Sequence, residues 1–231
     1  MNINGINYPT EDFEDRCIIV KNTDFLSPDK VVIPKKHLKY VSDIVLTRGL
    51  IIDRIEKLAY EIANDYKDKT VYLVIVMKGA VLFGTILQEK IYEISKKDDN
   101  NNIKIYLDYV QLISYKNDKS TGSLKIIDSD TLVKMKDKNI LIVEDIYDSG
   151  HCMDQFLVYL RTFSPADIKT CVLLQKMNSN NLTFRFKIDY LGFLIPNLFV
   201  IGFGNDYNEE FRDLNHLCII NQAGIDTFKN C

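Results

Sequence analysis

One stretch constrains this chain more than any other: a buried-strand pattern between Asn139 and Gly150 that ends abruptly in carboxylates. Residues 140–143 are all apolar and branched, which is typical of a strand covered on both faces of a sheet. Glu144 and Asp145 follow at once. Because ligands of open α/β sheets bind at the carboxyl ends of the strands, this stretch predicts a parallel sheet with a site at these two acids.

A small turn after the two acids adds a second kind of site. Asp148, Ser149 and Gly150 are turn-forming residues, and a helical pattern is predicted to begin near Met153. Backbone N–H groups at a helix N-terminus favour a phosphate. The carboxylates can bind the hydroxyl groups of a diol, and the turn beside them can bind a phosphate. Together they indicate a ligand such as ribose 5-phosphate. The alternative is an acidic strand end that only faces water.

Composition narrows the class of protein. The chain has 231 residues, of which 46% are hydrophobic, enough for one sizeable α/β domain. The net charge of −3 gives no indication of nucleic acid or membrane as a partner. The five cysteines and three histidines lack the spacing of a structural zinc site. No leader-like or membrane-spanning run is visible, so a reducing, cytoplasmic setting is expected.

Two lysines follow other predicted strands. The run at 71–77 precedes Lys78 and Gly79, and the run at 168–174 precedes Gln175 and Lys176. An unpaired buried ammonium group is costly, so a lysine at a ligand-binding edge indicates an anionic partner. A lysine that extends its charge to solvent is the alternative. Gly79 permits close approach of the backbone, which favours a site.

The remaining pattern predicts one domain. Its core spans about 50–200, and a small hood lobe combines about 1–48 with 200–231. Helices are expected at 50–66, from Gly79–Ala80 to about 94, and from Met153 to before Pro165. Further strands are expected at 17–20, 41–46, 103–113, 189–195, 198–202 and 217–220. Residues 95–102 are predicted to form a solvated loop. Residues 114–122 are predicted to form either a hairpin turn or a mobile lid.

Several motifs occur in the order of a known family. Val143-Glu-Asp-Ile-Tyr-Asp-Ser-Gly150 resembles the phosphoribosyl-diphosphate motif of type I phosphoribosyltransferases. The chain is also similar to hypoxanthine-guanine phosphoribosyltransferases over about 31–228, at Lys78-Gly79, Ser114-Tyr115, Asn117-Asp118, Ser120-Thr-Gly122, Lys176, Phe199-Val200, Asp206-Tyr-Asn-Glu209 and Phe211-Arg-Asp-Leu-Asn-His216. The resemblance implies the type I fold, a mostly parallel twisted sheet flanked by helices with a hood.

The resemblance also implies ligand contacts. The phosphoribosyl group would be bound by Glu144, Asp145, Asp148, Ser149, Gly150, His151 and Cys152. Pyrophosphate would be bound by Lys78, Gly79, Arg212, Ser114 and Tyr115. The purine would be bound by Lys176, Phe199, Val200 and Asp206. Magnesium would lie near Glu144, Asp145 and Asp206.

Specific roles follow from the same resemblance. Asp148 would be the general acid or base at purine N7, Lys176 would donate to the 6-oxo group, and Phe199 would stack on the base. The Met77–Lys78 peptide bond would be cis. Taken alone, Phe199 in its apolar run is more often a core residue, and Arg212 among acids is also explained by a surface ion pair.

The chain departs from the family pattern beside the site. His151 and Cys152 stand where lysine and threonine are usual, and the lost hydroxyl removes a phosphate hydrogen bond worth about 1.5–3 kcal/mol. Gln111, Ile113, Met177 and Asn205 replace an arginine, a lysine, an arginine and a leucine. An active enzyme of reduced strength is therefore expected.

The function expected from the resemblance is purine salvage. Hypoxanthine or guanine reacts with phosphoribosyl diphosphate to give IMP or GMP and pyrophosphate, with Mg²⁺ and in a homodimer or homotetramer. The alternative is a degenerate paralogue that binds nucleotide with little turnover, as a sensor or interaction protein. Acceptance of xanthine is left open by the sequence.

Overall fold

The computed structural model describes residues 15–114, 124–127, 132–177 and 187–230, with the strand pairs 2–3 and 6–7. Its main sheet has seven strands in the order β3-β10-β9-β8-β5-β6-β7, parallel except for the edge pair β6–β7. The strands are β3 (Ile18–Ile19), β5 (Thr70–Met77), β6 (Lys104–Ser114), β7 (Leu124–Ile127), β8 (Asn139–Tyr147), β9 (Asp167–Met177) and β10 (Tyr190–Pro196).

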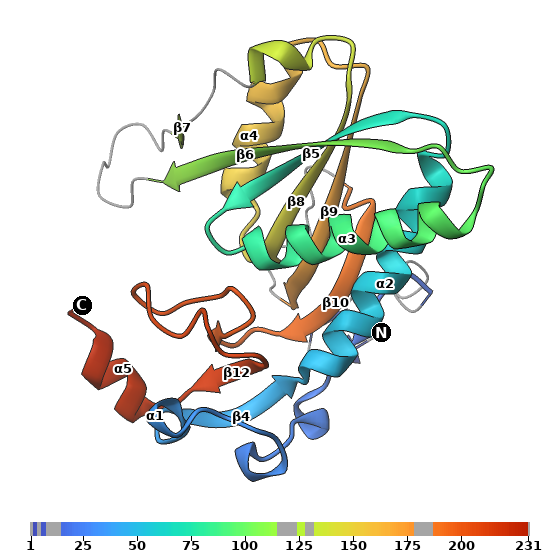
Figure 1. Ribbon diagram of the computed structural model, residues 1–231. Coiled ribbons are helices and arrows are strands. Elements are labelled where there is room, and N and C mark those ends of the chain that lie inside the picture. Colours follow the sequence, from blue (N-terminus) through green and yellow to red (C-terminus); the bar gives the residue numbers. More distant parts are fainter. Residues whose placement is uncertain are drawn as a thin grey trace.

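Helices cover both faces of this sheet, as the near-continuous apolar strands require (Figure 1). The long helices α2 (Arg48–Asp65) and α3 (Val81–Lys97) pack together on one face, and α4 (His151–Arg161) lies on the other. Alternate strand residues divide between two cores: Leu73 and Leu141 pack toward α2 and α3, and Val74 and Ile142 toward α4. The predicted helix-flanked, mostly parallel sheet is confirmed.

A second, smaller sheet joins distant parts of the chain. It has the order β11-β12-β4, formed by β4 (Val41–Leu46), β11 (Val200–Ile201) and β12 (Leu217–Ile220). With α1 (Lys35–Leu38) and α5 (Gln222–Phe228) it encloses a separate core around Ile44 and Phe211. Figure 1 shows this unit below the main sheet. Short 3-10 helices occur at Asn22–Asp24, Pro28–Lys30 and Leu132–Met135, and β1 (Asn2–Ile3) pairs with β2 (Ile6–Asn7).

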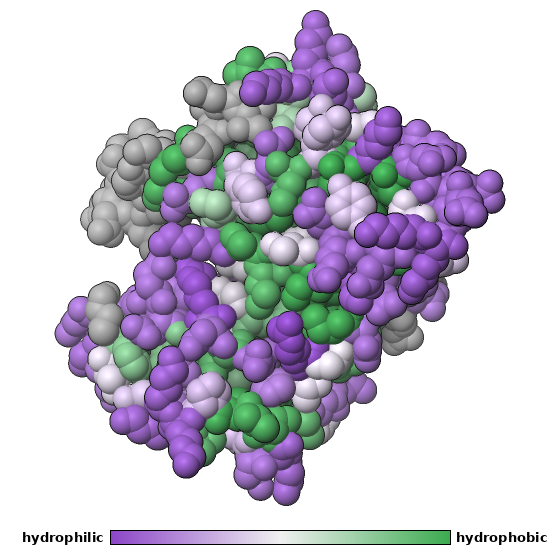
Figure 2. Space-filling view, viewed as in Figure 1, coloured by the Kyte–Doolittle hydropathy of each residue, from purple (hydrophilic) through white to green (hydrophobic). Residues whose placement is uncertain are grey.

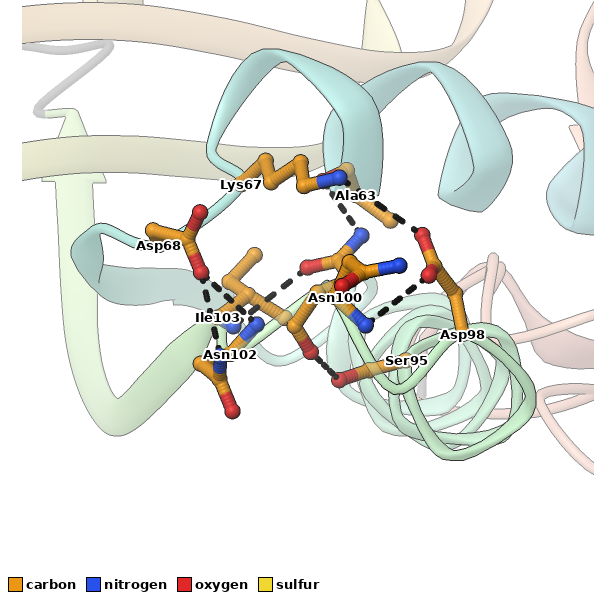
Figure 3. A network of polar contacts seen from close by, with 9 residues as sticks. Ala63, Lys67, Asp68, Ser95, Asp98, Asn100, Asn102 and Ile103 are labelled. Carbon is orange, nitrogen blue, oxygen red and sulfur yellow. Dashed lines mark hydrogen bonds and ion pairs between the residues drawn. The ribbon is translucent and has the colours of Figure 1, made fainter.

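The predicted loop at 95–102 is wrong in two respects. Helix α3 extends through Lys97, and Asn101 is buried. Its amide donates to Ala63 O at 3.0 Å, and its backbone O accepts from the Ser95 hydroxyl at 2.7 Å. We call Asp68, Ser95, Asp98, Asn101 and Asn102 the amino-edge cluster, since they lie where β5 and β6 begin; Figure 3 shows its contacts.

Other boundaries differ by a few residues. Helix α4 begins at His151 rather than near Met153, because Gly150 adopts φ = +75° and starts the helix directly after the turn. The strand predicted at 198–202 is shorter, Val200–Ile201. Over the described ranges, no helix has the length and apolar character needed to cross a membrane.

Candidate active site

The two acids of β8 lie where the sheet changes direction. In chain order β6 follows β5 on one side, whereas β8 pairs with the other side of β5. The β5–β8 pairing ends at Ile75↔Val143, so Glu144 and Asp145 follow at the carboxyl end of the ladder. Such a switch point is the usual ligand crevice of an open α/β sheet. Strand β8 itself continues to Tyr147 through its pairing with β9, so the expectation that the strand ends at the two acids is wrong, and the site at this end of the sheet stays a prediction.

Both carboxyl groups are held in a low-dielectric environment. Burial raises the pKa of Glu144 well above its usual value, and the nearby Asp145 charge raises it further. Burial also raises the pKa of Asp145, against the lowering effects of the Glu144 side chain and the backbone N–H groups of Asp145 and Ile146. Two acids that are difficult to ionise together favour a cation or a hydroxyl-rich ligand as their partner.

Two glycines let three segments meet beside Asp145. A β-carbon on Gly79 would lie 1.9 Å from Asp145 Oδ2, and one on Gly204 would lie 2.3 Å from Gly79 O. Any larger residue at either position would separate the segments. The Met77–Lys78 bond before Gly79 is cis, as the motif implied.

The phosphate-type turn borders a cavity of about 260 Å³. Helix α4 makes its first backbone bond from Asp154 N–H to Gly150 O at 2.8 Å, so the preceding N–H groups lie in the unpaired first turn. A β-carbon on Gly150 would lie 1.9 Å from the Tyr147 hydroxyl, so only glycine fits this position. Predicted residues lining the cavity are Glu144, Asp148, Ser149, Gly150 and Cys152. His151 is exposed and its ring contacts Gln155 Nε2 at 3.0 Å.

A cation–carboxylate pair lies at the end of β9. Lys176 is almost buried, and its Nζ lies 2.9 Å from Asp148 Oδ2 and 5.9 Å from the centre of the Phe199 ring. Phe199 is 51% exposed, so the core alternative for this phenylalanine is wrong. Its ring meets Tyr207 edge-on, with centroids 5.5 Å apart. Val200 is buried beside it and pairs with Ile219.

The other two predicted cations are both paired with acids. Lys78 Nζ lies 2.9 Å from Glu209 Oε2. Arg212 NH2 lies 2.9 Å from Asp206 Oδ1 and 3.5 Å from the same Glu209 oxygen. Arg212 NH1 donates to Gly204 O at 2.8 Å. The Lys78 hydrogen bond is the main cause that lowers the pKa of Glu209.

Some predicted residues are only partly described. Ser114 ends β6, whereas Tyr115 and the rest of the proposed lid lie outside the described residues. Of the departures from the pattern, Cys152 lines the cavity, Met177 is buried in the core under α4, and buried Asn205 donates to Gly202 O at 3.3 Å. No role is predicted from the sequence for Glu209 or Gly204. Asn208, a residue type that tolerates positive φ, is the local sign of a turn there.

The space-filling view shows where this edge opens (Figure 2). The outline has a notch between the main sheet and the smaller unit, at the carboxyl ends of β5 and β6 in Figure 1. Hydrophilic residues cover the lower side of the notch. The lower side of this opening is thus polar.

Comparison with known proteins gives the family. The phosphoribosyl transferase domain model matches residues 42–208. The chain belongs to this phosphoribosyltransferase family. Phosphoribosyltransferase domain-containing protein 1 of Homo sapiens is 39% identical over 196 residues, which are 85% of this chain and 86% of that protein. Hypoxanthine-guanine phosphoribosyltransferase of Rattus norvegicus is 37% identical over 201 residues, 87% of this chain and 91% of that protein.

A solved phosphoribosyltransferase has the same fold. The crystal structure of hypoxanthine-guanine phosphoribosyltransferase from Schistosoma mansoni in complex with IMP matches with a TM-score of 0.77 and 25% identity. The match covers 92% of this chain and 98% of that one. The type I phosphoribosyltransferase fold expected from the motifs is confirmed.

Phosphoribosyltransferases of this kind generally use Mg²⁺ with their donor. Among the described residues, no three or more His, Cys, Asp or Glu side chains group to hold a metal, so Asp206 does not complete a cluster with Glu144 and Asp145. Half-buried Glu144 and buried Asp145 still fit magnesium, which binds through one or two carboxylates and completes its shell with water and substrate phosphates.

Proposed function

We propose that this phosphoribosyltransferase joins hypoxanthine or guanine to phosphoribosyl diphosphate, giving IMP or GMP and pyrophosphate. The observation that carries the proposal is the 2.9 Å contact between Lys176 Nζ and Asp148 Oδ2. O6 and N7 are neighbouring acceptor atoms on one edge of guanine. An ammonium group for O6 must therefore lie beside an acid or base for N7, and this pair has that arrangement.

The purine would lie between the exposed Phe199 ring and this pair. Lys176 would leave Asp148 and donate to the 6-oxo group, which selects oxopurines over adenine. Asp148 would then hold or release a proton at N7 while N9 attacks the anomeric carbon, as a general acid or base. The backbone carbonyls of Val200 and Asp206 would face the pyrimidine edge of the base.

The donor would occupy the carboxyl edge. Glu144 and Asp145 would bind the ribose hydroxyls, and the first turn of α4, with Ser149, Gly150, His151 and Cys152, would bind the 5-phosphate. Bound Mg²⁺, held by Glu144, Asp145 and the donor, would neutralise charge on the leaving pyrophosphate. Lys78, Gly79, Arg212, Ser114 and Tyr115 would contact that pyrophosphate.

We further propose that the smaller sheet serves as the hood over this site, in a homodimer or homotetramer of the cytoplasm. The separate core of the smaller sheet and its position below the main sheet in Figure 1 support the hood. The alternative is a paralogue that binds nucleotide with little turnover. It draws support from the departures that remove a hydroxyl and positive charge beside the site, among them Cys152 in the cavity.

Initial rates with hypoxanthine, guanine, xanthine and adenine, with Mg²⁺ and phosphoribosyl diphosphate, test the proposal. We expect turnover of hypoxanthine and guanine, and a rate about 10²–10⁴-fold lower for Asp148→Asn, the usual contribution of a general acid or base. Equal, negligible rates in both proteins with retained nucleotide binding would favour the non-catalytic alternative. A preference for adenine would contradict the role of Lys176.

A further inference from the structure

Two tight turns follow one another on the segment that carries Asp206. Gly202 and Asn205 exchange backbone hydrogen bonds of 2.8 and 3.0 Å, and Tyr207 and Glu210 exchange two of 3.1 Å. The central residues of both turns have positive φ: Phe203 at 47° and Gly204 at 94°, then Asn208 at 48° and Glu209 at 68°. Positive φ at both central positions is the pattern of a type I′ turn.

The two turns differ at their second central position. Glycine is strongly preferred there, since a β-carbon is disfavoured at positive φ. Gly204 follows the preference in the first turn, and Glu209 departs from it in the second. A glutamate at a position that favours glycine indicates that its side chain has a use.

The contacts of Glu209 indicate that use. Its Oε2 lies 2.9 Å from Lys78 Nζ and 3.5 Å from Arg212 NH2, so one carboxylate oxygen faces both cations. Its own N–H donates to Asp206 Oδ2 at 2.8 Å, which fixes the backbone in the orientation that aims the side chain at them. Lys78 is 131 residues away in sequence, so the turn connects two separate parts of the site.

We propose that Glu209 occupies the pyrophosphate-binding cations Lys78 and Arg212 in the ligand-free chain and competes with pyrophosphate for them. The inference rests on the proposed function, which gives these two cations to the leaving pyrophosphate. A phosphate oxygen that reaches them must displace the Glu209 carboxylate. When pyrophosphate leaves, the carboxylate returns and the cations are paired again.

The ion pairs of Glu209 are weak enough for pyrophosphate to displace the carboxylate. The side chains of Lys78 and Glu209 are 52% and 62% exposed, and exposed ion pairs contribute little. The pyrophosphate carries more charge and can also be bound by magnesium, so it displaces the carboxylate readily. The consequence is weaker product binding and faster release, in a class of step that often limits turnover.

Titration calorimetry of the full chain with inorganic pyrophosphate and Mg²⁺ tests the inference. We expect Glu209→Gln, which keeps the shape but removes the charge, to bind pyrophosphate about fivefold more tightly. Glu209→Gly should act in the same direction and raise the thermal midpoint, because glycine suits the turn. In steady-state kinetics the pyrophosphate inhibition constant should fall by the same factor.

Glu210→Gln is the matched control. It removes the same formal charge from the next residue, which is also exposed, and should change pyrophosphate affinity by less than about twofold. Unchanged or weaker binding by Glu209→Gln, or an equal gain by Glu210→Gln, would overturn the inference while leaving the transfer reaction intact. If the wild type neither binds pyrophosphate nor transfers the phosphoribosyl group, the proposed function fails and the inference fails with it.

Discussion

The amino and carboxyl ends of the strands in the main sheet, called here its amino edge and carboxyl edge, differ in how their polar groups are paired. At the amino edge, buried Asn101 donates to Ala63 O at 3.0 Å, and its side-chain oxygen accepts from Ile103 N–H at 3.4 Å. At the carboxyl edge, half-buried Glu144 lies next to buried Asp145, and removal from water raises the pKa of both. The polar groups of the amino-edge cluster are satisfied by hydrogen bonds within the chain, whereas the two acids of the carboxyl edge lie at the proposed ligand site.

The difference between the two edges indicates that the amino edge stabilises the fold and that the carboxyl edge carries the proposed chemistry. The amino-edge cluster links the ends of α2 and α3 to the starts of β5 and β6 through short contacts (Figure 3). The carboxyl edge uses the same strands, but its charged groups form pairs that can exchange partners, such as Lys176 with Asp148 and Lys78 with Glu209. Substitutions at the two edges should therefore have separable effects.

The largest effect on stability is expected from Asn101→Ala. The change leaves the buried Ala63 O and Ile103 N–H without this partner, at a cost of about 2–4 kcal/mol. The thermal midpoint should fall by roughly 5–10 °C, with the initial rate at 25 °C unchanged. Asn100→Ala, at the exposed neighbouring residue, should shift it by less than about 2 °C. A lowered rate in folded Asn101→Ala would show that the two edges are coupled.

Glu144→Gln is expected to change the thermal midpoint by less than Asn101→Ala and in the opposite direction. Neutralising one of the two adjacent acids should raise the thermal midpoint at pH 7.5 without Mg²⁺ by roughly 2–4 °C and weaken binding of phosphoribosyl diphosphate. The raised pKa means that the folded wild type binds more protons than the unfolded chain above pH 4.5. Wild-type stability should therefore fall as pH rises through this range, more steeply than in the variant. A lower midpoint for the variant would contradict the comparison.

The smallest expected effect on stability concerns His216, the residue before β12. Its Nδ1 accepts from Arg48 N–H at 2.9 Å, and burial lowers its pKa below 6.5. Below pH 6.5 the unfolded chain therefore binds a proton that the folded chain resists, so stability falls as the pH falls through the folded pKa. His216→Asn keeps an acceptor but does not titrate. Denaturant unfolding between pH 5 and 7 should show a flatter stability profile for this variant; identical profiles would exclude the histidine as the cause.

The features that the sequence predicts correctly are those that depend on patterns among neighbouring residues. The run at 140–143 and the acids after it depend only on neighbouring residues, and β8 lies where that run predicts. Asn101 was misassigned because 98–102 is uniformly polar, and its burial arises from contact with Ala63, which is 38 residues away. Similarly, the Glu209–Glu210 pair looks like a solvated stretch until the positive φ values of the turn direct one of the two carboxylates to Lys78.

The contact of Gly204 with Gly79 O has a mechanical consequence. It leaves no room for a side chain between the segment after β11 and the loop after β5, and Arg212 NH1 is bonded to Gly204 O at 2.8 Å. The two segments therefore bear directly on each other, and a displacement of one is transmitted to the other. If the segment after β11 binds the purine and the loop after β5 binds pyrophosphate, as proposed above, movement of the first as a purine enters would reach the second through backbone contact, without any side chain as intermediary.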